Sequence, residues 1–182
     1  MQQIIEACKS GNSFAQKRLF DHYVKRLFRL AMRYVRSTED AEEMVMNGFL
    51  KFFHSLETFE YHDEPRLEVW LKRIVVNECL MHLRRQKVTW ASLEDIDNQM
   101  DTPTESVPTD SMIEAEELYA LILELPAGYR TIFNLYAIEG YSHQEIAQQL
   151  GISQGTSKSQ LSKARAVLQT LLSQRGYAQR TH

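Results

Sequence analysis

The feature that most constrains the fold of this chain is a pair of helix-start signals separated by one glycine near its carboxyl end. Ser142 stands three residues before Glu145, the capping-box spacing in which each side chain can bond the backbone amide of the other residue. Gly151 can supply the left-handed residue that ends the helix begun in this way, and Ser153 can cap the next one. The pattern predicts two helices joined by a short turn, a helix-turn-helix.

The second helix of this pair, predicted over residues 154–172, has an apolar and a polar face. Leu161, Ala164, Val167 and Leu168 share the apolar face by their spacing. No Asp or Glu lies between residues 150 and 182, so nothing on the polar face repels phosphate. A plain solvated face is the alternative, but it leaves the lack of acids unexplained. We therefore predict that this helix reads the major groove of DNA through Thr156, Lys158, Ser159, Gln160, Ser162, Lys163 and Arg165.

Charge divides the chain into three parts. Residues 88–129 carry many acids and no Lys or Arg, whereas both flanking regions are rich in bases. Pro103 and Pro108 stand there among Ser, Thr, Asp and Asn, a linker composition. We expect an amino-terminal domain over residues 1–87, a flexible acidic linker over 88–111 and a carboxyl-terminal domain over 112–182. The linker is either a spacer or a DNA mimic that covers the basic surfaces of the free protein.

The front half predicts three helices. Apolar residues recur at helical spacing over residues 13–34. Ser37 stands three residues before Asp40 in another capping-box arrangement, and the helix that it begins ends near Ser55. Residues 59–64 show no period, and Pro65 suits the first turn of a third helix, which ends in a basic tract at residues 84–87. No segment alternates as a strand does, so the predicted fold class is all-α, with a helical bundle followed by a helix-turn-helix domain.

Other classes of protein fit the sequence poorly. No apolar run approaches the roughly eighteen residues of a membrane span, and the amino-terminal residues lack the order of a secretion signal, so we expect a cytoplasmic protein. Cys8 and Cys79 form no CxxC and are expected to be buried thiols. The histidines follow no motif such as HExxH, so we predict no metal, no cofactor and no enzymatic activity.

The segment GYSHQEIAQQLGISQGTSKSQLSKAR resembles the promoter-reading motif of extracytoplasmic-function sigma factors, within the sigma-70 family. Residues 40–50 resemble the polymerase-binding helix of that family, and residues 70–85 resemble its promoter-melting helix. The resemblance spans residues 13–172, and FNLYAIEGYSHQEIA is most similar to Bacteroidetes-type members. It implies a transcription initiation factor whose partners are core RNA polymerase, promoter DNA and an inhibitory anti-sigma factor. It implies no small-molecule substrate and no insertion into a membrane.

The resemblance also implies roles for individual residues. Positions that dock the polymerase match Glu43, Met46, Asn47, Phe49 and Phe53. Residues 59–66 match the segment that captures an extruded base of the minus-ten element. Side chains that can wall such a base, or hold the strand backbone beside it, are Phe59, Tyr61, His62, Arg66, Lys72, Arg73 and Asn77. The last three are expected along one side of their helix.

This sequence departs from the family pattern at three positions. Asn47 stands where an acid is usual, Met81 where Asp is frequent, and Ser157 where an apolar residue is usual. A buried Ser157 hydroxyl would need a hydrogen-bond partner, because burying an unpaired polar group is costly.

Two other functions were weighed. A helix-turn-helix transcriptional regulator would bind promoter DNA without core polymerase, but it would not need the two basic and aromatic helices of the front half. A helical metal-dependent hydrolase would need convergent carboxylates and histidines, which the sequence motifs do not indicate.

Overall fold

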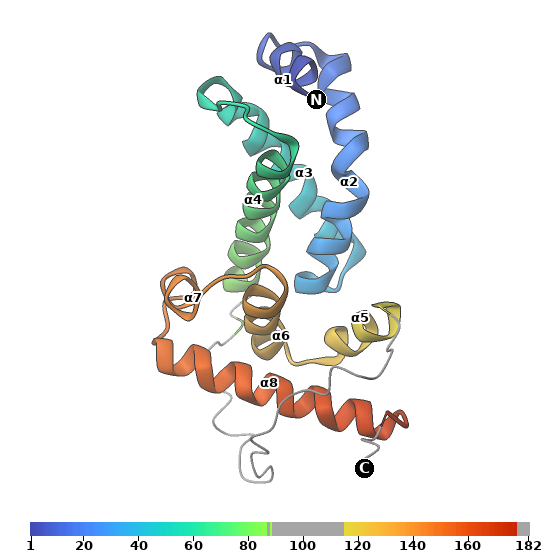
Figure 1. Cartoon of the computed structure of the whole chain (residues 1–182), viewed down its shortest axis with the longest axis vertical. Helices are drawn as coiled ribbons and strands as arrows, with labels where there is room; N and C mark the ends of the chain where they lie inside the picture. The colour runs from blue at the N-terminus through green and yellow to red at the C-terminus, as the bar shows by residue number, and fades with distance from the viewer. Residues whose placement is uncertain (87, 89–114, 178–182) are drawn as a thin grey trace. The chain divides into compact units, whose positions relative to one another are not determined.

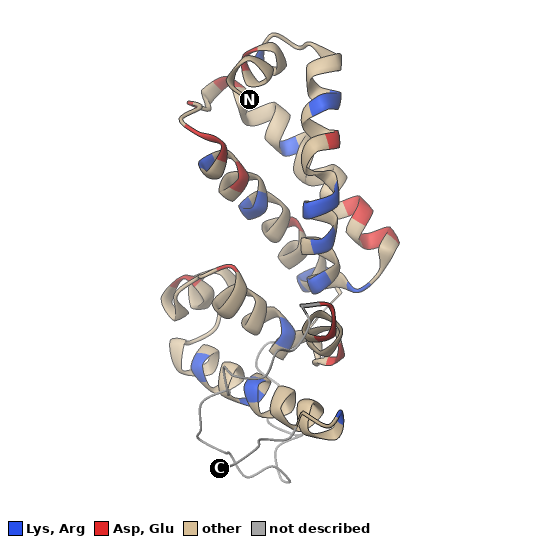
Figure 2. Ribbon diagram, turned by 45° about the vertical axis from the view of Figure 1, so that its right-hand side comes forward, with Lys and Arg blue, Asp and Glu red and all other residues tan. Residues whose placement is uncertain are grey.

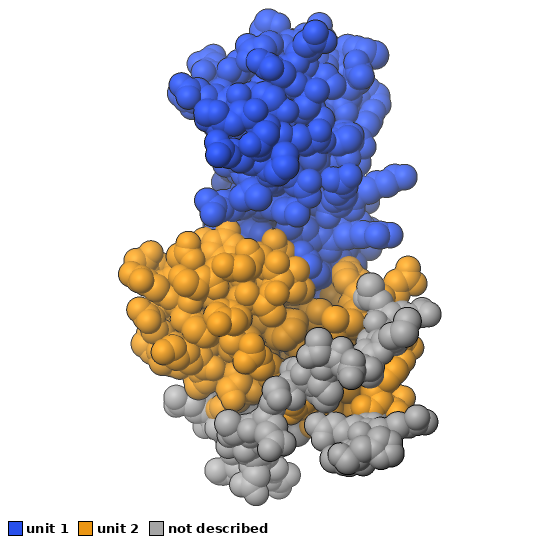
Figure 3. All heavy atoms as spheres, in the orientation of Figure 1, with its two compact units in different colours: residues 1–86 blue, residues 87–182 orange. Residues whose placement is uncertain are grey.

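The computed structural model describes residues 1–86, 88 and 115–177 (Figure 1). The chain divides into two compact units, Met1–Gln86 and Lys87–His182, which Figure 3 shows in separate colours. All regular structure in the described residues is helical, which confirms the all-α prediction. The predicted acidic linker, apart from residue 88, lies outside the described residues. Among the described helices, none has both the length and the apolar character needed to cross a membrane.

Unit 1 is a helical bundle. Its elements are α1 (Gln2–Lys9), α2 (Ser13–Val35), α3 (Thr38–Ser55), the short 3-10 turn η1 (Leu56–Thr58) and α4 (Glu64–Arg85). Helices α2, α3 and α4 each pack against the other two, and α1 packs against α2. The core between them includes Tyr23, Tyr34, Phe49 and Phe52, and Cys8 and Cys79 are buried free thiols as predicted.

The sequence analysis missed α1. This helix has only eight residues, of which only Ile5 and Cys8 are buried, so its apolar pattern is too short to show a period. The side chain of Asn12 then caps α2 by accepting a hydrogen bond from the amide of Ala15.

Helices α3 and α4 pack closely against each other at Gly48. A Cβ atom at this position would lie 2.7 Å from Cγ2 of Val75, well inside van der Waals contact. The close packing of these two helices therefore requires glycine at position 48.

The helix starts of unit 1 follow the predicted cap chemistry in part. Ser37 caps α3 by accepting a hydrogen bond from the amide of Asp40 at 3.1 Å. The Asp40 carboxylate lies 3.5 Å from Nε2 of His82 in α4. Asp63 caps α4, whose first turn holds Pro65 as expected. The start of α3 therefore has the predicted serine cap, while its acid faces a neighbouring helix.

Unit 2 contains α5 (Ala115–Glu124), α6 (Ala127–Phe133), the π-helical turn η3 (Asn134–Ile138), α7 (His143–Leu150) and α8 (Gln154–Gln174). The π-helical turn follows α6 directly, and no pattern in the sequence indicates it. Gly140 follows with φ 76°, a left-handed conformation that glycine adopts without strain. The core of this unit includes a cluster of Leu121, Ile122, Leu125, Tyr129, Ala164 and Leu168, and Ile132, Leu135, Ile146, Leu150 and Leu161 are buried as well.

Candidate nucleic-acid interface

The helix-turn-helix of unit 2 forms as its caps predict. At the start of α7, Ser142 Oγ accepts a hydrogen bond from the amide of Glu145 at 3.3 Å, and Glu145 Oε2 accepts one from the amide of Ser142 at 2.8 Å. Gly151 ends α7 with φ 69°. Ser153 caps α8 by accepting a hydrogen bond from the amide of Thr156 at 2.9 Å. Local chemistry therefore fixes both helix ends that orient α8.

Most residues predicted to contact DNA from α8 reach the surface. Lys158, Ser159, Ser162 and Arg165 are exposed, and Thr156 and Lys163 are half-buried. All six remain available at the surface of a helix that carries no acid between Gln154 and Gln174.

Gln160 was placed wrongly. Its side chain is only 3% exposed, because it lies on the same helix face as the buried Ser157, Leu161 and Ala164. The sequence prediction placed Gln160 on the DNA-contacting face because it is polar, although its helical spacing puts it among the buried residues. Gln160 therefore faces the interior of the unit and is not part of the outward surface.

The buried Ser157 hydroxyl has a partner that the sequence analysis missed. Nδ1 of His143, at the start of α7, lies 2.9 Å from Ser157 Oγ. The His143 ring also stacks on Tyr136, with ring centroids 4.4 Å apart and 22° between the ring planes. We call this contact the Ser157–His143 pair, and it joins the two helices of the helix-turn-helix through a polar bond inside their packing.

The surroundings of His143 favour its neutral form. Desolvation by burial lowers the pKa of His143 below its usual value, and the positive charges of Lys158 and Arg165 lower it further. The Arg165 guanidinium lies 6.0 Å from the centroid of the Tyr136 ring. A neutral imidazole can share the hydrogen bond with Ser157 in either tautomer, so the pair is satisfied at neutral pH.

In unit 1, the predicted base-capture segment lies between η1 and α4 (Figure 1). Phe59 stacks flat on Trp70, with ring centroids 4.3 Å apart and 9° between their planes. Trp70 in turn lies against Phe52, at 5.0 Å between ring centroids. Tyr61 is half-buried and His62 is exposed. The segment therefore starts from an aromatic platform anchored on the core.

The polar residues of α4 form two separate groups. Arg66, Arg73 and Asn77 are exposed and share one helix face by their spacing of seven and four residues. Lys72 is on another side, where its Nζ lies 2.9 Å from Glu68 Oε1. The expectation that Lys72 lines up with Arg73 and Asn77 is therefore wrong, because one residue along a helix turns a side chain by about 100°.

Glu68 joins α4 to α2. Its second oxygen, Oε2, accepts a hydrogen bond from the Arg26 guanidinium of α2 at 3.2 Å. One turn earlier, Glu64 Oε1 lies 3.1 Å from Nε2 of His22. The hydrogen bond from Lys72, opposed in part by desolvation and supported by Arg26, lowers the pKa of the Glu68 carboxyl. We call Glu64 and Glu68, which make these contacts between α4 and α2, the acidic seam.

The residues predicted to dock polymerase lie on α3. Glu43 and Met46 are exposed, and Asn47 and Phe53 are half-buried. Phe49 is only 1% exposed and packs against Phe20, at 4.8 Å between ring centroids. Its predicted role as a direct contact is wrong in this conformation, since a side chain inside the core can only support the surface from below.

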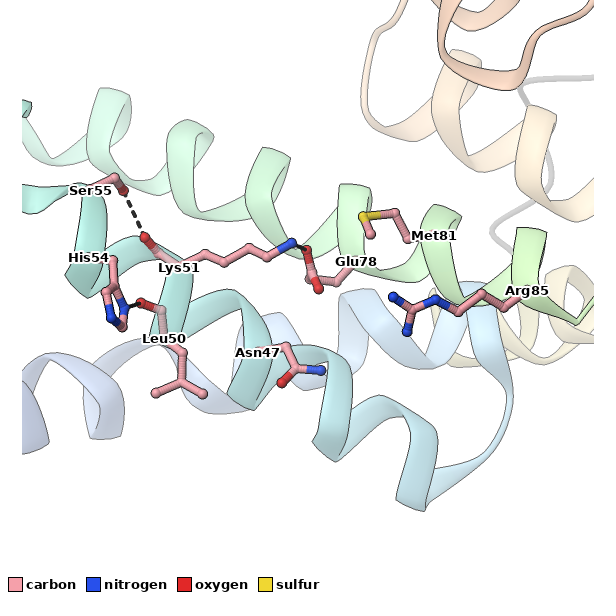
Figure 4. A pocket seen from close by; sticks show the side chains of 8 residues that line it. All are labelled: Asn47, Leu50, Lys51, His54, Ser55, Glu78, Met81 and Arg85. Carbon is pink, nitrogen blue, oxygen red and sulfur yellow. Dashed lines mark hydrogen bonds and ion pairs between the residues drawn. The ribbon is translucent and has the colours of Figure 1, made fainter.

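A shallow pocket opens beside these residues between α3 and α4 (Figure 4). It is lined by Asn47, Leu50, Lys51, His54, Ser55, Glu78, Met81 and Arg85. Lys51 Nζ lies 2.5 Å from Glu78 Oε1, and the Glu78 side chain is only 9% exposed. Leu50 and Met46 are each 51% exposed. Leu50 and Met46 lie one turn apart on α3 and form an exposed apolar rim.

Two protein-family models match this chain. One, described as Sigma-70 region 2, matches residues 19–89, and the other, described as Sigma-70, region 4, matches residues 115–168. The first covers most of α2 and all of α3 and α4, which carry the residues predicted to dock polymerase and to capture a base. The second covers the helix-turn-helix and most of α8.

Known proteins match over most of their length. The ECF RNA polymerase sigma factor SigM of Mycobacterium tuberculosis is 33% identical over 171 residues, which cover 93% of this chain and 83% of that protein. The RNA polymerase sigma-H factor of Pseudomonas aeruginosa is 26% identical, with 94% of this chain and 93% of that protein covered.

Among solved structures, the sigma factor RpoE of Bartonella quintana, crystallised with the anti-sigma factor NepR, has a similar fold. The TM-score is 0.52 at 22% identity, over 86% of this chain and 96% of that chain. The sequence relatives and both region models agree with the helix-turn-helix and the helical bundle described above. This chain therefore belongs to the sigma-70 family, among its extracytoplasmic-function RNA polymerase sigma factors.

Proposed function

We propose that this chain binds core RNA polymerase, directs it to selected promoters and helps to open them. In this proposal, residues 1–87 form the domain that binds polymerase and melts the minus-ten element. Residues 112–182 form the domain that reads the minus-thirty-five element, and 88–111 connect them. The observation that carries the proposal is the acid-free, exposed face of α8 on a fully capped helix-turn-helix, in the same chain as a sigma-70 region 2 bundle.

Recognition of the upstream element uses α8. Lys158 and Arg165 are exposed cations that suit phosphate oxygens or guanine edges, and hydroxyls such as Ser159 and Ser162 suit either base edges or phosphates. Base-edge contacts each add roughly 1–3 kcal/mol of discrimination. Phosphate contacts fix the register of the helix in the groove. The Ser157–His143 pair supports this by holding α8 on α7.

Opening of the downstream element uses the base-capture segment and α4. Unstacking a base costs a few kcal/mol, and an aromatic surface can offset this cost by stacking. Phe59, held flat on Trp70, offers such a surface, and Tyr61 and His62 can line its side. Arg66, Arg73 and Asn77 then form a row along α4 that can follow the strand backbone. Lys72 can join this row only if it leaves Glu68.

Binding to polymerase uses α3 and the pocket beside it. Met46 and Leu50 give an exposed apolar rim of the kind that anchors protein interfaces. Glu43, Asn47 and Phe53 add polar and aromatic contacts next to it, with Phe49 beneath as a support. Asn47 replaces a usual acid of the family, so we expect the polar part of this contact to differ from that of its relatives.

We further propose an inhibitory anti-sigma protein as a regulatory partner, acting on this chain in the cytoplasm. The support is the family membership and the anti-sigma factor NepR seen with RpoE of Bartonella quintana. The phrase FNLYAIEGYSHQEIA supports a Bacteroidetes-type origin. Affinity capture with the full chain from membranes and from soluble extract tests the partner; recovery of core polymerase alone from both fractions would count against it.

Run-off transcription tests the main proposal. Core polymerase with this chain should give transcripts from a subset of promoter fragments, and core polymerase alone should give none from them. A helix-turn-helix regulator acting without polymerase core would instead bind the fragments by itself and fail to co-purify with the core enzyme. Absence of both co-purification and transcripts would contradict the proposed function.

A further inference from the structure

A row of unpaired cations runs along α2, outside every site described so far. Arg18, Lys25, Arg29 and Arg36 are all exposed. Their spacing of seven and four residues places Arg18, Lys25 and Arg29 on one side of the helix, and Arg36 follows its end in a left-handed conformation. At about 1.5 Å per residue the row is roughly 27 Å long. We call these four residues the α2 row, and Figure 2 shows the Lys and Arg positions spread along this helix.

The α2 row differs from several other basic residues of unit 1 because no acid pairs with it. Lys17 pairs with Asp21, Arg26 with Glu68, and Lys51 with Glu78. Within the described part of the chain, none of the four residues of the row takes part in an ion pair or a side-chain hydrogen bond. Asp21 is the only acid of α2. Like charges held together without counter-charges cost free energy, so a surface of this kind suits an anionic partner.

The position of the α2 row relates it to the proposed DNA-opening surface. Helices α2 and α4 run in the same direction, because His22 meets Glu64 and Arg26 meets Glu68 one turn further along both helices. The row on α2 therefore runs parallel to α4 and beside the acidic seam. Arg66 lies about 200° around α4 from Glu64 and Glu68, so the exposed row of α4 faces away from α2. The two rows are separate tracks on different faces of unit 1 that can each accept phosphates.

We propose that the α2 row binds the phosphate backbone of double-helical promoter DNA next to the segment that α4 opens. This inference rests on the proposed function, which brings DNA to unit 1. Duplex DNA offers one phosphate per about 3.4 Å along each strand, so a row of four cations can reach several of them. The row contributes affinity that does not depend on base sequence.

The composition of the row favours duplex DNA over other anionic partners. A protein partner would need an apolar centre, and the only large apolar side chain on this side of α2 that is strongly exposed is Phe14, at 70%, beyond one end of the row. A single strand would need aromatic side chains interleaved with the cations for its bases to stack on. Between Arg18 and Arg29 the aromatic ring on this side of the helix is that of His22, which is paired with Glu64.

The test compares two double variants of the full chain. Lys25→Gln/Arg29→Gln removes two charges from the α2 row and leaves helix-forming side chains of similar length. Lys9→Gln/Lys17→Gln removes two charges from the same unit outside the row, and both residues already have acid partners. Far-ultraviolet circular dichroism with a thermal melt confirms that both variants fold.

Binding is measured by fluorescence anisotropy on a labelled promoter duplex over a range of salt concentrations, for the free chain and for the complex with core polymerase. For Lys25→Gln/Arg29→Gln, the slope of log K against log salt concentration should become shallower by about 1–2, since each phosphate contact contributes about 0.9. The loss should be the same for a duplex of unrelated sequence. The control variant should keep the wild-type slope.

Three results would overturn the inference. The first is an unchanged salt slope for duplex DNA, and the second is a loss of affinity confined to a single-stranded oligonucleotide. The third is a loss of affinity for core polymerase with normal DNA binding, which would assign the row to a protein partner. The free-chain measurement decides the matter even if no polymerase complex forms. If the wild-type chain gives no transcripts while the slope still changes as predicted, the proposed function fails and the phosphate surface stands.

Discussion

The acidic seam of unit 1 and helix α8 of unit 2 present their cations in opposite ways. On the α4 side of unit 1, Lys72 and Arg26 are both held by Glu68. In unit 2, α8 carries no acid, and Lys158 is exposed at its first turns. A helix that reads closed duplex must offer its donors before DNA arrives, whereas a surface that holds an opened strand must not capture DNA too early. The same kinds of cationic side chain are therefore exposed on an acid-free helix in unit 2 and held in ion pairs at the acidic seam of unit 1.

The units also differ in how they are packed. Unit 1 joins long helices by a close approach at Gly48, where even one methyl group has no room. Unit 2 has a small apolar core and secures α7 on α8 with the buried Ser157–His143 pair. Tight apolar packing therefore defines the first unit, and a specific polar contact helps to define the second.

The largest expected effect is that of Gly48→Ala. The added methyl group would press on Val75, so we expect unit 1 to lose about 2–3 kcal/mol of unfolding free energy, measured by urea denaturation. Gly155→Ala is the matched change in unit 2, where the nearest side-chain atom is Ser153 Oγ at 3.5 Å. It should be neutral or slightly stabilising, because alanine favours helices. Equal destabilisation by both changes would contradict the contrast in packing.

Ser157→Ala should have a smaller effect, confined to unit 2. It removes the partner of His143 Nδ1, which costs about 1 kcal/mol, and a double-mutant cycle with His143→Phe measures the coupling between the two side chains. We expect the Ser157→Ala cost to fall in the His143→Phe background. Strict additivity of the two changes would show that the hydrogen bond contributes nothing.

Glu68→Gln tests whether acids restrain the opening surface. Freeing Lys72 and Arg26 should tighten the binding of single-stranded minus-ten DNA to the polymerase complex by a few-fold, because exposed ion pairs are worth about 1 kcal/mol or less. Glu57→Gln removes an exposed acid from η1 that has no ion pair among the described residues, and serves as the control. If fluorescence anisotropy showed an equal gain in DNA affinity for both variants, the effect would be one of net charge alone.

The pH dependence of unit 2 should be the smallest effect. Desolvation and the nearby Lys158 and Arg165 lower the pKa of His143 in the folded chain, so the unfolded chain takes up a proton first as the pH falls. This contribution to stability is complete above about pH 6.5, the usual histidine value. It is lost as the pH falls through the folded pKa. Thermal unfolding between pH 5 and 7.5 should show this loss in the wild type, and His143→Phe should reduce it.

The features that sequence predicted best are those fixed by neighbouring residues. Each cap of the helix-turn-helix depends on residues within one helical turn of it, so the sequence alone reveals both helix ends. These caps are formed by Ser142 with Glu145, by Gly151 and by Ser153. The helices of unit 1 followed from their apolar period, except α1, which is too short to show one. The outward residues of α8 were predicted from charge and spacing, and six of the seven residues named from the sequence reach the surface.

The features that sequence could not predict depend on contacts between distant segments. Gln160 is polar, yet it is buried because α8 turns that face inward. The partner of Ser157 lies fourteen residues earlier in the chain, and Glu68 meets Arg26 forty-two residues away. Periodicity gives the side of a helix but not the partner that covers it. Arg18, Lys25 and Arg29 form a visible cluster in the sequence. The sequence does not show which cations of unit 1 have acid partners in the fold.

The central claim is that unit 2 reads duplex promoter DNA while unit 1 binds polymerase. The most direct measurement is on Lys158→Glu, with binding to core polymerase and binding of the complex to an upstream-element duplex followed in parallel. We expect affinity for the duplex to fall by at least about tenfold, since a lost phosphate or base contact is worth roughly 1–3 kcal/mol, with polymerase affinity unchanged. Loss of both activities together, or of polymerase binding alone, would contradict this division of labour.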